Sequence, residues 1–481
     1  MEAEPQGFAA VPVTGLAFDS RRVGPGTVFV AVPGAKADGL AFAAKAAEAG
    51  AAAVVGQGER PADLPPGTPY LHVADVRQAL AHAAARLHPR QPDRVVAVTG
   101  TSGKSSVADF VRQLFAKLGH RSASVGTLGV ITSDGAAYGS LTTPDPIALH
   151  TTLDQLAGEG VTRLAMEASS HGIDQRRLDG VRLAAAGFTN LGRDHLDYHQ
   201  TVEAYRDAKL RLFDTLLPVG APAVINADGP FAEIFLATAA TRGPVLSTGR
   251  AGDTLRLMES RAEGFAQRLT LVVHWAGRHH TAETTLPLLG GFQVENALVA
   301  AGLVLASEPG ADPDQVLGHL ANLKGVPGRL EAVGEVESAL CIVDYAHKPD
   351  ALEHVLTALR PFTPGRLVCV FGCGGDRDRG KRPLMGEIAV RLADSVIVTD
   401  DNPRSERPEA IRGEILAAAP GAREIGDRAE AIRAAVAELS RGDVLVVAGK
   451  GHETGQIVGD RTLPFSDHDV VRAAIAEREA R

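Results

Sequence analysis

The sequence predicts an α/β protein of three domains, on the basis of its strand and helix pattern, its length and two proline-flanked junctions. Short apolar runs typical of buried strands alternate with helical stretches rich in Ala, Leu, Glu and Arg, as in parallel sheets covered by helices. The chain has 481 residues, enough for about three domains of typical size. The predicted strands are 27–32, 94–98, 164–167, 367–371, 395–399 and 443–448, and one predicted helix is 107–118.

Two junctions that contain proline divide the chain. The first is 89–92 (PRQP), directly before a predicted strand, and the second is 325–328 (GVPG). Proline and glycine interrupt regular structure and are common in linkers. We therefore predict an N-terminal domain over 1–90, a large central domain over 91–326 and a C-terminal domain over 327–481.

Composition excludes several classes of protein. Lys and Arg total 49 against 58 Asp and Glu, a formal net charge of -9, without a basic stripe, and aromatic residues make up 4%. We therefore expect no nucleic-acid partner. Three sparse cysteines fit a reducing compartment. The first residues do not resemble a signal peptide, and no stretch of about 18 apolar residues occurs. We expect a cytoplasmic protein without membrane insertion, and nothing implies an obligate protein partner.

The strongest local signal is a glycine-rich turn between a strand and a helix. Residues 95–98 (VVAV) lead into 99–106 (TGTSGKSS). Backbone N–H groups in such a turn bind phosphate oxygens, a lysine reaches the β- and γ-phosphates, and a hydroxyl can ligate Mg²⁺. Val98 stands where the general phosphate-loop pattern has its first glycine, and Gly100 follows two residues later. The alternative is an ordinary turn with a surface lysine, which the complete strand–turn–helix context disfavours.

Lys209 falls on the apolar face of a predicted helix over 201–213. That face carries Val202, Tyr205, Leu212 and Phe213 at helical spacing. Burial favours the neutral amine, which could add CO₂ to form a carbamate. Alternatively, the long side chain could reach the surface with its ammonium group. Helix geometry leaves both interpretations open.

Polar clusters follow other predicted strands. In the central part these are 166–171 (MEASSH) and 190–199 (NLGRDHLDYH), whose carboxylate and imidazole groups can ligate Mg²⁺ or position phosphate. In the C-terminal part, three strands run into 372–378, 400–404 and 449–453. The carboxyl ends of parallel strands share one edge, so these three loops should meet. Their arginines suit carboxylates and Glu453 suits an ammonium group. A dinucleotide fingerprint is disfavoured because Arg377 occupies its third glycine position.

Taken in order, the motifs resemble those of the Mur ligase family over nearly the whole chain. They are DSR (19–21), TGTSGKSS (99–106), LTTP (141–144), MEASSHG (166–172), NLGRDHLDYH (190–199), AKLRLF (208–213), GGFQVENALVA (290–300), GRLE (328–331), DYAH (344–347), GCGGDRDRGKRP (372–383), DDNPR (400–404) and AGKGHE (448–453). The resemblance implies a central phosphate-loop ATPase sheet between an N-terminal UDP-binding domain and a C-terminal Rossmann-like domain.

The resemblance also implies roles for individual residues. Expected ATP contacts are Gly100, Thr101, Ser102, Gly103, Lys104, Ser105, Ser106, Asn296, Arg329 and Asp344. Expected catalytic residues are Lys104, Glu167, His195 and Lys209. Expected magnesium ligands are Ser105, Glu167, His195 and Lys209, with Lys209 as an N-carboxylated lysine. Expected contacts to a UDP-muramoyl dipeptide are Ser20, Ala35, Lys36, Ala37, Thr142, Thr143, Ser169, Gln175 and Arg177. The expected amino-acid site is Arg377, Asp401, Asn402, Pro403, Arg404, Gly449 and Glu453.

Some positions depart from the usual family pattern. Leu141 replaces a polar residue before the threonine pair, which bears on one sugar-nucleotide contact. Ser102, Ser105 and Ser106 replace commoner Asn and Thr residues, although Ser105 retains the hydroxyl. Gln293 stands where Asn is frequent.

The implied reaction is the ATP-dependent addition of meso-2,6-diaminopimelate to UDP-N-acetylmuramoyl-L-alanyl-D-glutamate through an acyl phosphate, in peptidoglycan synthesis. Arg404 favours diaminopimelate over L-lysine, because a guanidinium facing lysine's uncharged stem would lack a partner. LL-diaminopimelate stays open. The alternatives are a lysine-adding relative, a folylpolyglutamate synthetase-like ligase, a nucleotide switch and a binding-only homologue. A switch would not need a buried lysine among magnesium ligands.

Overall fold

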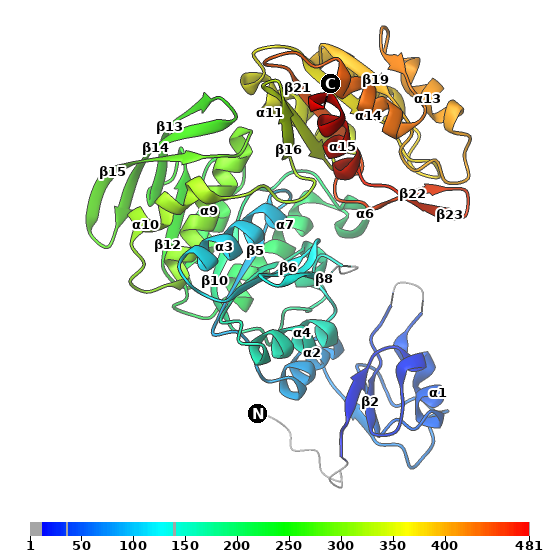
Figure 1. Cartoon of the computed structure of the whole chain (residues 1–481). Helices are drawn as coiled ribbons and strands as arrows, with labels where there is room; N and C mark the ends of the chain where they lie inside the picture. Colours follow the sequence, from blue (N-terminus) through cyan, green and yellow to red (C-terminus); the bar gives the residue numbers. More distant parts are fainter. Residues whose placement is uncertain (1–11, 35–36, 138–140, 481) are drawn as a thin grey trace. The chain divides into compact units, whose positions relative to one another are not determined.

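The computed structural model describes residues 12–34, 37–137 and 141–480 and confirms the predicted α/β class (Figure 1). Contacts between residues group the chain into two compact units. Unit 1 comprises Met1–Thr254 and Val299–Asp312, and unit 2 comprises Leu255–Leu298 and Pro313–Arg481. The division into 1–90, 91–326 and 327–481 stays a prediction.

The first part of unit 1 is a small parallel sheet with the strand order β1-β2-β3-β4. Phe29 and Val54 lie in its core beneath the short helix α1. The predicted strand 27–32 is observed, two residues shorter, as β2. Helix α2 packs on α4 of the same unit. The elements are β1 Gly15–Ala17, η1 Ser20–Arg22, β2 Thr27–Val30, η2 Gly39–Phe42, α1 Ala43–Glu48, β3 Ala53–Gly56, β4 Tyr70–His72 and α2 Val76–Leu87.

The larger sheet of unit 1 has the order β12-β11-β10-β5-β9-β6-β7-β8. From β12 to β6, each strand in this order pairs in parallel with the next. Strands β7 and β8 extend the sheet at the β6 edge by antiparallel pairing. The strands are β5 Arg94–Thr99, β6 Ser122–Gly126, β7 Gly129–Thr132, β8 Gly135–Ala137, β9 Arg163–Glu167, β10 Leu183–Phe188, β11 Ala223–Asn226 and β12 Val245–Gly249. Central β5 lies between β9 and β10, so their carboxyl ends share one edge.

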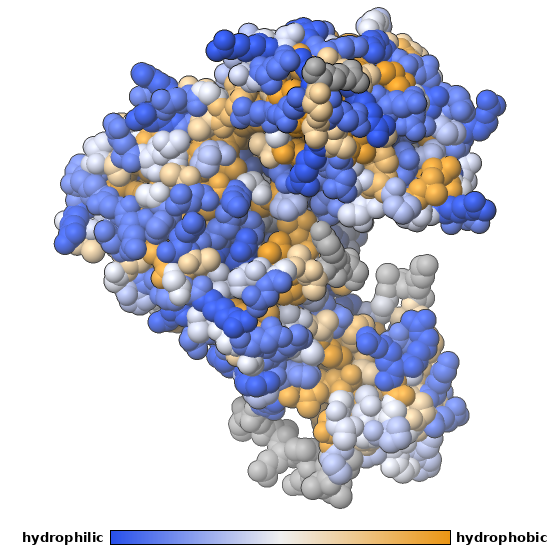
Figure 2. All heavy atoms as spheres, in the orientation of Figure 1, coloured by the Kyte–Doolittle hydropathy of each residue, from blue (hydrophilic) through white to orange (hydrophobic). Residues whose placement is uncertain are grey.

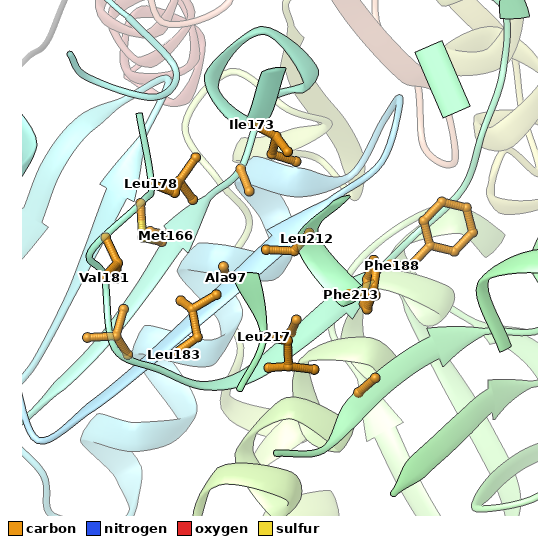
Figure 3. Packing of buried hydrophobic residues seen from close by; sticks show 14 of the residues in the cluster. Ala97, Met166, Ile173, Leu178, Val181, Leu183, Phe188, Leu212, Phe213 and Leu217 are labelled. Atoms are coloured by element: carbon orange, nitrogen blue, oxygen red, sulfur yellow. The ribbon is translucent and has the colours of Figure 1, made fainter. Parts of the chain in front are cut away.

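Apolar side chains of β5, β9 and β10 pack with the end of helix α7 to form the main core of unit 1 (Figure 3). Ala97, Met166, Leu183 and Phe213 belong to this cluster, and the Phe188 ring stacks on Phe235. The core fixes the strand ends that carry the polar clusters. The helices of this region are α3 Lys104–Lys117, α4 Pro146–Gly158, α5 Ser170–Asp174, α6 Leu196–His199, α7 Val202–Arg211, the π-helical turn η3 Leu212–Leu216, α8 Ala232–Ala240 and α9 Gly291–Ser307, which runs from unit 2 into unit 1.

Unit 2 contains a sheet with the order β16-β17-β21-β18-β19-β20. Only its β16–β17 pair is antiparallel among the described strands. Apolar clusters cover both faces, which explains the continuous apolar runs in its strands. The elements are α10 Pro313–Gly318, η4 His319–Asn322, β16 Glu331–Val336, β17 Ala339–Asp344, α11 Pro349–Leu359, η5 Arg360–Phe362, β18 Leu367–Phe371, α12 Lys381–Leu392, β19 Ser395–Val398, α13 Pro408–Leu416, β20 Arg423–Glu424, α14 Arg428–Ala437, β21 Val444–Ala448 and α15 Asp467–Glu479.

Two antiparallel regions of unit 2 have no counterpart in the sequence prediction. One is formed by β13 Leu255–Glu263, β14 Ala266–Trp275 and β15 Arg278–Leu286, and the other by β22 Gly455–Val458 and β23 Arg461–Pro464. Alternating burial along β14 shows one buried face and one solvated face.

On the face drawn in Figure 2, hydrophilic residues cover much of the surface and apolar residues show between them in separate groups. Cys341, Cys369 and Cys373 are free and buried, as expected from their sparse spacing. Among the described residues, no helix combines the length and the hydropathy needed to cross a membrane.

Candidate functional site

The glycine-rich loop lies at the carboxyl end of β5, where the segment after β10 holds it. Thr101 N–H donates to the Asn190 carbonyl (2.9 Å) and Ser102 N–H to Asn190 Oδ1 (3.0 Å), while Thr189 Oγ1 donates to the Ser102 carbonyl (2.6 Å). A Cβ atom on Gly100 would lie 1.9 Å from Thr189 Oγ1. Two adjacent strand ends therefore fix the loop conformation, and this conformation requires glycine at residue 100.

Two lysine side chains point at this loop. Lys104 Nζ, on the first residue of α3, donates to the carbonyls of Gly100 (2.8 Å) and Thr101 (3.0 Å). Lys209 Nζ, from α7, donates to the same Gly100 carbonyl (2.8 Å). Two amine side chains therefore converge on one loop, and the Lys104 ammonium makes this a position that suits the phosphates of a nucleotide.

Lys209 is only 1% exposed and its Nζ lies 4.5 Å from the centre of the Tyr205 ring. The interpretation in which its ammonium reaches the surface is therefore wrong. Burial, reinforced by the nearby Lys104 ammonium, lowers the pKa of Lys209 well below its ordinary value. Burial also raises the pKa of Tyr205 to about 12, so its hydroxyl stays protonated beside Thr101 Oγ1, 3.2 Å away. The site thus favours a neutral amine.

Glu167 and Ser105 lie together beside the loop. The Glu167 side chain is 2% exposed, and its Oε1 accepts from Ser105 Oγ (2.9 Å) and from Thr127 N–H (2.7 Å). Oxygen ligands of this kind suit Mg²⁺, which usually binds one or two protein groups and completes its shell with water and phosphate. These residues therefore fit the predicted metal.

The predicted magnesium ligand His195 is connected to Lys209 through Tyr205: its imidazole packs edge-to-face on the Tyr205 ring, with ring centres 6.1 Å apart, and that ring contacts Lys209 Nζ. The His195 imidazole also packs edge-to-face on His171 with ring centres 4.7 Å apart, and its Nε2 lies 3.6 Å from Asp194 Oδ2. Within the described ranges, no hydrogen bond or ion pair joins it to Ser105, Glu167 or Lys209, and no three His, Cys, Asp or Glu side chains gather as a metal-binding group. Its metal role stays a prediction.

Five of the predicted dipeptide contacts form one connected network next to Glu167. Thr143 Oγ1 donates to the Glu167 carbonyl (2.9 Å) and lies 3.0 Å from Ser169 Oγ, which caps helix α5. Arg177 donates to the Thr143 carbonyl (2.6 Å) and to Gln175 Oε1 (2.7 Å). Thr142 joins through Thr127 Oγ1 (3.0 Å).

The remaining predicted dipeptide residues are Ser20, Ala35, Lys36 and Ala37. Ser20 begins η1, whose N-cap is Asp19, and Ala37 is exposed. Ala35 and Lys36 lie outside the described residues. Leu141, the departure next to the threonine pair, is 45% exposed. The UDP role of this region stays a prediction.

The strand-end loops of unit 2 meet as expected. Asn402 Nδ2 donates to Glu453 Oε2 (3.0 Å), and Arg404 Nη1 donates to the Gly375 carbonyl (2.8 Å). Gly375 N–H in turn donates to the Asn402 carbonyl (2.9 Å). A Cβ on Gly449 would approach Asp401 Oδ2 to 2.7 Å. Asp401, Asn402 and Pro403 are buried beside these groups.

The two arginines differ in their surroundings. Arg404 is half-buried and has a left-handed backbone (φ 52°). Arg377 is exposed. In the part of the chain that the structure describes, neither guanidinium forms an ion pair with a carboxylate. Both can therefore bind a carboxylate of a ligand.

Two of the three predicted nucleotide residues outside the loop, Asp344 and Arg329, lie close enough for their charges to interact. The Asp344 carboxylate accepts from the Leu330 and Ala346 amides (both 2.7 Å), and the Arg329 guanidinium lies 4.9 Å from the centre of the Tyr345 ring. Burial raises the pKa of Asp344 despite these hydrogen bonds. Asn296 lies on α9 and donates to Gln293 Oε1 (3.3 Å).

The sequence prediction did not include Asn190, Thr127 and Lys450 as site residues. Asn190 and Thr127 act on the loop and on Glu167 through hydrogen bonds across strands, which motif spacing does not reveal. Lys450 is fully buried between Asn402 and Glu453. The feature of the sequence that could have identified Lys450 is its position between two glycines directly after a buried strand.

The chain matches three family descriptions in order. Mur ligase family, catalytic domain, covers residues 12–88; Mur ligase middle domain covers 98–304; and Mur ligase, glutamate ligase domain, covers 328–451.

Similar curated proteins span the same length. A UDP-N-acetylmuramoyl-L-alanyl-D-glutamate–2,6-diaminopimelate ligase of Mesorhizobium japonicum is 59% identical over 98% of this chain and 96% of its own. The protein of that name from Agrobacterium fabrum is 58% identical over 98% of this chain and 95% of its own.

Solved structures agree with the fold. A structure of a UDP-N-acetylmuramoyl-L-alanyl-D-glutamate–2,6-diaminopimelate ligase has a TM-score of 0.74 and 35% identity, covering 97% of this chain and 96% of its own. MurF ligase from Thermotoga maritima, in complex with ADP, has a TM-score of 0.60 at 18% identity, covers 98% of this chain and 99% of its own, and supports the fold alone. The family descriptions and the full-length relatives show that this chain belongs to the Mur ligase family.

Proposed function

We propose that this protein is an ATP-dependent ligase that adds meso-2,6-diaminopimelate to UDP-N-acetylmuramoyl-L-alanyl-D-glutamate in peptidoglycan precursor synthesis. Relatives that are 55–59% identical over nearly the whole chain are named as ligases of UDP-N-acetylmuramoyl-L-alanyl-D-glutamate and 2,6-diaminopimelate. The reaction joins the D-glutamyl carboxylate of the acyl donor to an amine of the diamino acid. A carboxylate oxygen is a poor leaving group, so the carboxylate must first be activated.

Activation uses ATP at the loop of unit 1. The γ-phosphoryl group passes to the carboxylate oxygen, giving an acyl phosphate and ADP. The incoming amine then attacks the acyl carbon, forms the C–N bond, loses a proton and expels phosphate. The Lys104 ammonium and the loop N–H groups offset negative charge on the phosphates. Ser105 and Glu167 would hold Mg²⁺, which neutralises phosphate charge when bound.

We further propose that Lys209 carries a carbamate. Its burial and lowered pKa support this, since only the neutral amine can react with CO₂. Nζ would form a bond to the carbon of CO₂ and release a proton. The product is an anion beside the Lys104 ammonium, where it would replace a neutral amine with a favourable charge pair and offer oxygen ligands to a second Mg²⁺.

The acyl donor would lie along the network from Thr142 to Arg177. Thr143, Ser169 and Arg177 offer hydroxyl and guanidinium groups next to the Glu167 strand end. Such donors suit the carboxylates of a dipeptide. Ser20 and residues 35–37 would contact the UDP group.

The proposal that the added amino acid is diaminopimelate depends on Arg404. Its half-buried guanidinium donates to the carbonyls of Gly375 (2.8 Å) and Asn402 (3.5 Å), without a carboxylate partner in the described residues. A cation in this setting needs an anion, and the second carboxylate of diaminopimelate supplies one. L-Lysine has no group to pair with it. The arginine does not distinguish meso- from LL-diaminopimelate.

The test is phosphate release by purified enzyme with the UDP-dipeptide, ATP and single amino acids. We expect release with meso-diaminopimelate and little with L-lysine. In Arg404→Ala, kcat/KM for diaminopimelate should fall about 100-fold, because a charge-assisted carboxylate contact is lost. The exposed Arg407→Ala variant of the same loop is the control. A preference for L-lysine, or an unchanged kcat/KM in Arg404→Ala, would contradict the assignment.

A further inference from the structure

Lys450 is the second residue after the central strand β21, and its side chain is completely buried. Gly449 (φ 117°) and Gly451 (φ 53°) flank it. A Cβ on Gly451 would lie 2.8 Å from Tyr345 Cβ, so the turn is tightly packed. This conformation directs a lysine into the unit and away from solvent, which is an unfavourable position unless its ammonium group has partners.

The partners are two residues of the predicted amino-acid site. Lys450 Nζ donates to Asn402 Oδ1 (3.1 Å) and to Glu453 Oε2 (3.0 Å), while Asn402 Nδ2 also donates to Glu453 Oε2 (3.0 Å). The three side chains thus form a closed triangle. The backbone N–H of Ile457 donates to the same Asn402 Oδ1 (2.9 Å).

This triangle decides which way the Asn402 amide points. An ammonium group and a backbone N–H can only donate, so the atom that faces both of them must be the amide oxygen. That oxygen then has both acceptor positions occupied. The amide NH₂ group faces Glu453, and no acceptor among the described residues takes its second hydrogen.

The same triangle fixes the state of Glu453. Burial raises the pKa of Glu453, but the Asn402 hydrogen bond and the Lys450 ammonium outweigh it and hold the pKa below its usual range. Oε2 accepts from both partners, whereas no hydrogen bond from the described residues reaches Oε1. An ionised carboxylate with one available oxygen suits the ammonium group of an amino acid.

We propose that Lys450 is a positioning residue of the amino-acid site, which turns the Asn402 N–H and the Glu453 Oε1 toward the zwitterionic end of the substrate. The inference rests on the proposed function and deepens it. Lys450 itself is buried behind these two residues and acts through them. It therefore sets the affinity for the diamino acid and leaves the phosphoryl-transfer groups of unit 1 unaffected.

The test is steady-state kinetics of full-length Lys450→Met with varied meso-diaminopimelate and saturating ATP and UDP-dipeptide. Methionine keeps the length of the side chain without its donors. We expect KM for diaminopimelate to rise about 10- to 100-fold, as for loss of a buried charged hydrogen bond, with little change in kcat or in KM for ATP. The acid limb of kcat/KM should move to higher pH, because Glu453 without Lys450 protonates more readily.

Two further variants separate positioning from folding. Arg366→Met removes the ion pair with buried Asp443 at the other end of β21 (2.7 Å) and should leave KM for diaminopimelate unchanged. Lys450→Gln, which keeps N–H donors without a charge, should show an intermediate KM. In a Glu453→Gln background, Lys450→Met should raise KM for diaminopimelate by a smaller factor than in the wild type, because its effect passes through Glu453.

The outcomes are distinguishable. A folded Lys450→Met enzyme with wild-type KM for diaminopimelate, or with a lower kcat at unchanged KM, would overturn the positioning role alone. Unfolding of both Lys450→Met and Lys450→Gln, seen as loss of the thermal transition, would make Lys450 a structural residue and also overturn it. A wild-type enzyme that releases no phosphate with diaminopimelate would contradict the proposed function, and the inference would fall with it.

Discussion

Lys209 shows how one residue position can combine a structural cost with a chemical use. An amine that is 1% exposed and near a second ammonium group is unfavourable in its charged form. The fold accepts this cost because α7 is anchored by apolar neighbours, including Leu212 and Phe213. The lowered pKa makes a neutral nucleophile available close to the phosphate loop.

The pH dependence of stability tests this account of Lys209. Its folded-state pKa lies well below the ordinary 10.5 of the unfolded chain. Between these two values the unfolded state binds more protons, so this residue makes the free energy of unfolding rise with pH. In CO₂-free buffer, the wild type should gain stability relative to Lys209→Met between pH 7 and pH 9, measured by urea unfolding. A difference that does not change with pH would contradict a neutral Lys209.

Bicarbonate provides the activity readout for the same residue. We expect wild-type activity to fall in CO₂-free buffer and to recover with bicarbonate, whereas Lys209→Met stays inactive in both. Full activity of Lys209→Met, or an intact mass that shows only the unmodified amine in active enzyme, would refute the carbamate.

At the residue scale, the sequence pointed to the buried Lys209 because its side chain broke a pattern. Lys209 was singled out because it interrupts an apolar helical face. Lys450 was missed as a site residue because its burial depends on the conformation of two flanking glycines and on Asn402, which is distant in sequence. The same holds for Thr127, whose contact to Glu167 joins two strand ends.

At the scale of elements, the phosphate loop depends on a neighbouring strand. The loop after β5 is held by Thr189 and Asn190 at the end of β10, through three hydrogen bonds of 2.6–3.0 Å. The contacts are so close that Gly100 admits no side chain. Parallel pairing of β5 with β10 sets this distance.

Gly100→Ala should therefore disrupt nucleotide binding while the sheet remains folded. The added methyl group would lie 1.9 Å from Thr189 Oγ1, so the loop must shift and its N–H groups lose their positions. We expect kcat/KM for ATP to fall about 100-fold. Gly229→Ala, with open space around the added Cβ, is the matched control. Equal kcat/KM values for ATP in both variants would show that the loop is not constrained in this way.

Parallel strands were predicted well because both of their faces are buried and their sequences are continuous apolar runs. The runs 367–371 and 395–399 correspond to β18 and β19. The antiparallel strands β13–β15 were missed because their exposed faces carry charged residues. Alternation of apolar and polar residues along β14 was the signal that could have identified them.

At the scale of the whole molecule, the assignment to the Mur ligase family from the sequence depends on the order of the motifs along the chain. The motifs follow one another along the 481 residues in the order in which the family has them. Several fall at strand ends, such as 99–106 after β5, 372–383 after β18 and 448–453 at the end of β21. The family could be predicted because it depends on these motifs, and the α/β fold could be predicted because apolar strand runs alternate with helical stretches. Hydrogen-bond partners could not, because they depend on which strands are neighbours and on side-chain conformation.

The most direct test of the account is to identify the product of a competition reaction. Purified enzyme receives ATP, UDP-N-acetylmuramoyl-L-alanyl-D-glutamate and equal amounts of meso-diaminopimelate, LL-diaminopimelate and L-lysine, and the nucleotide products are separated and weighed by mass spectrometry. We expect one UDP-muramoyl tripeptide whose mass and hydrolysate contain diaminopimelate, formed together with ADP and phosphate. A tripeptide that contains lysine, or ATP hydrolysis without any tripeptide, would contradict the proposed function.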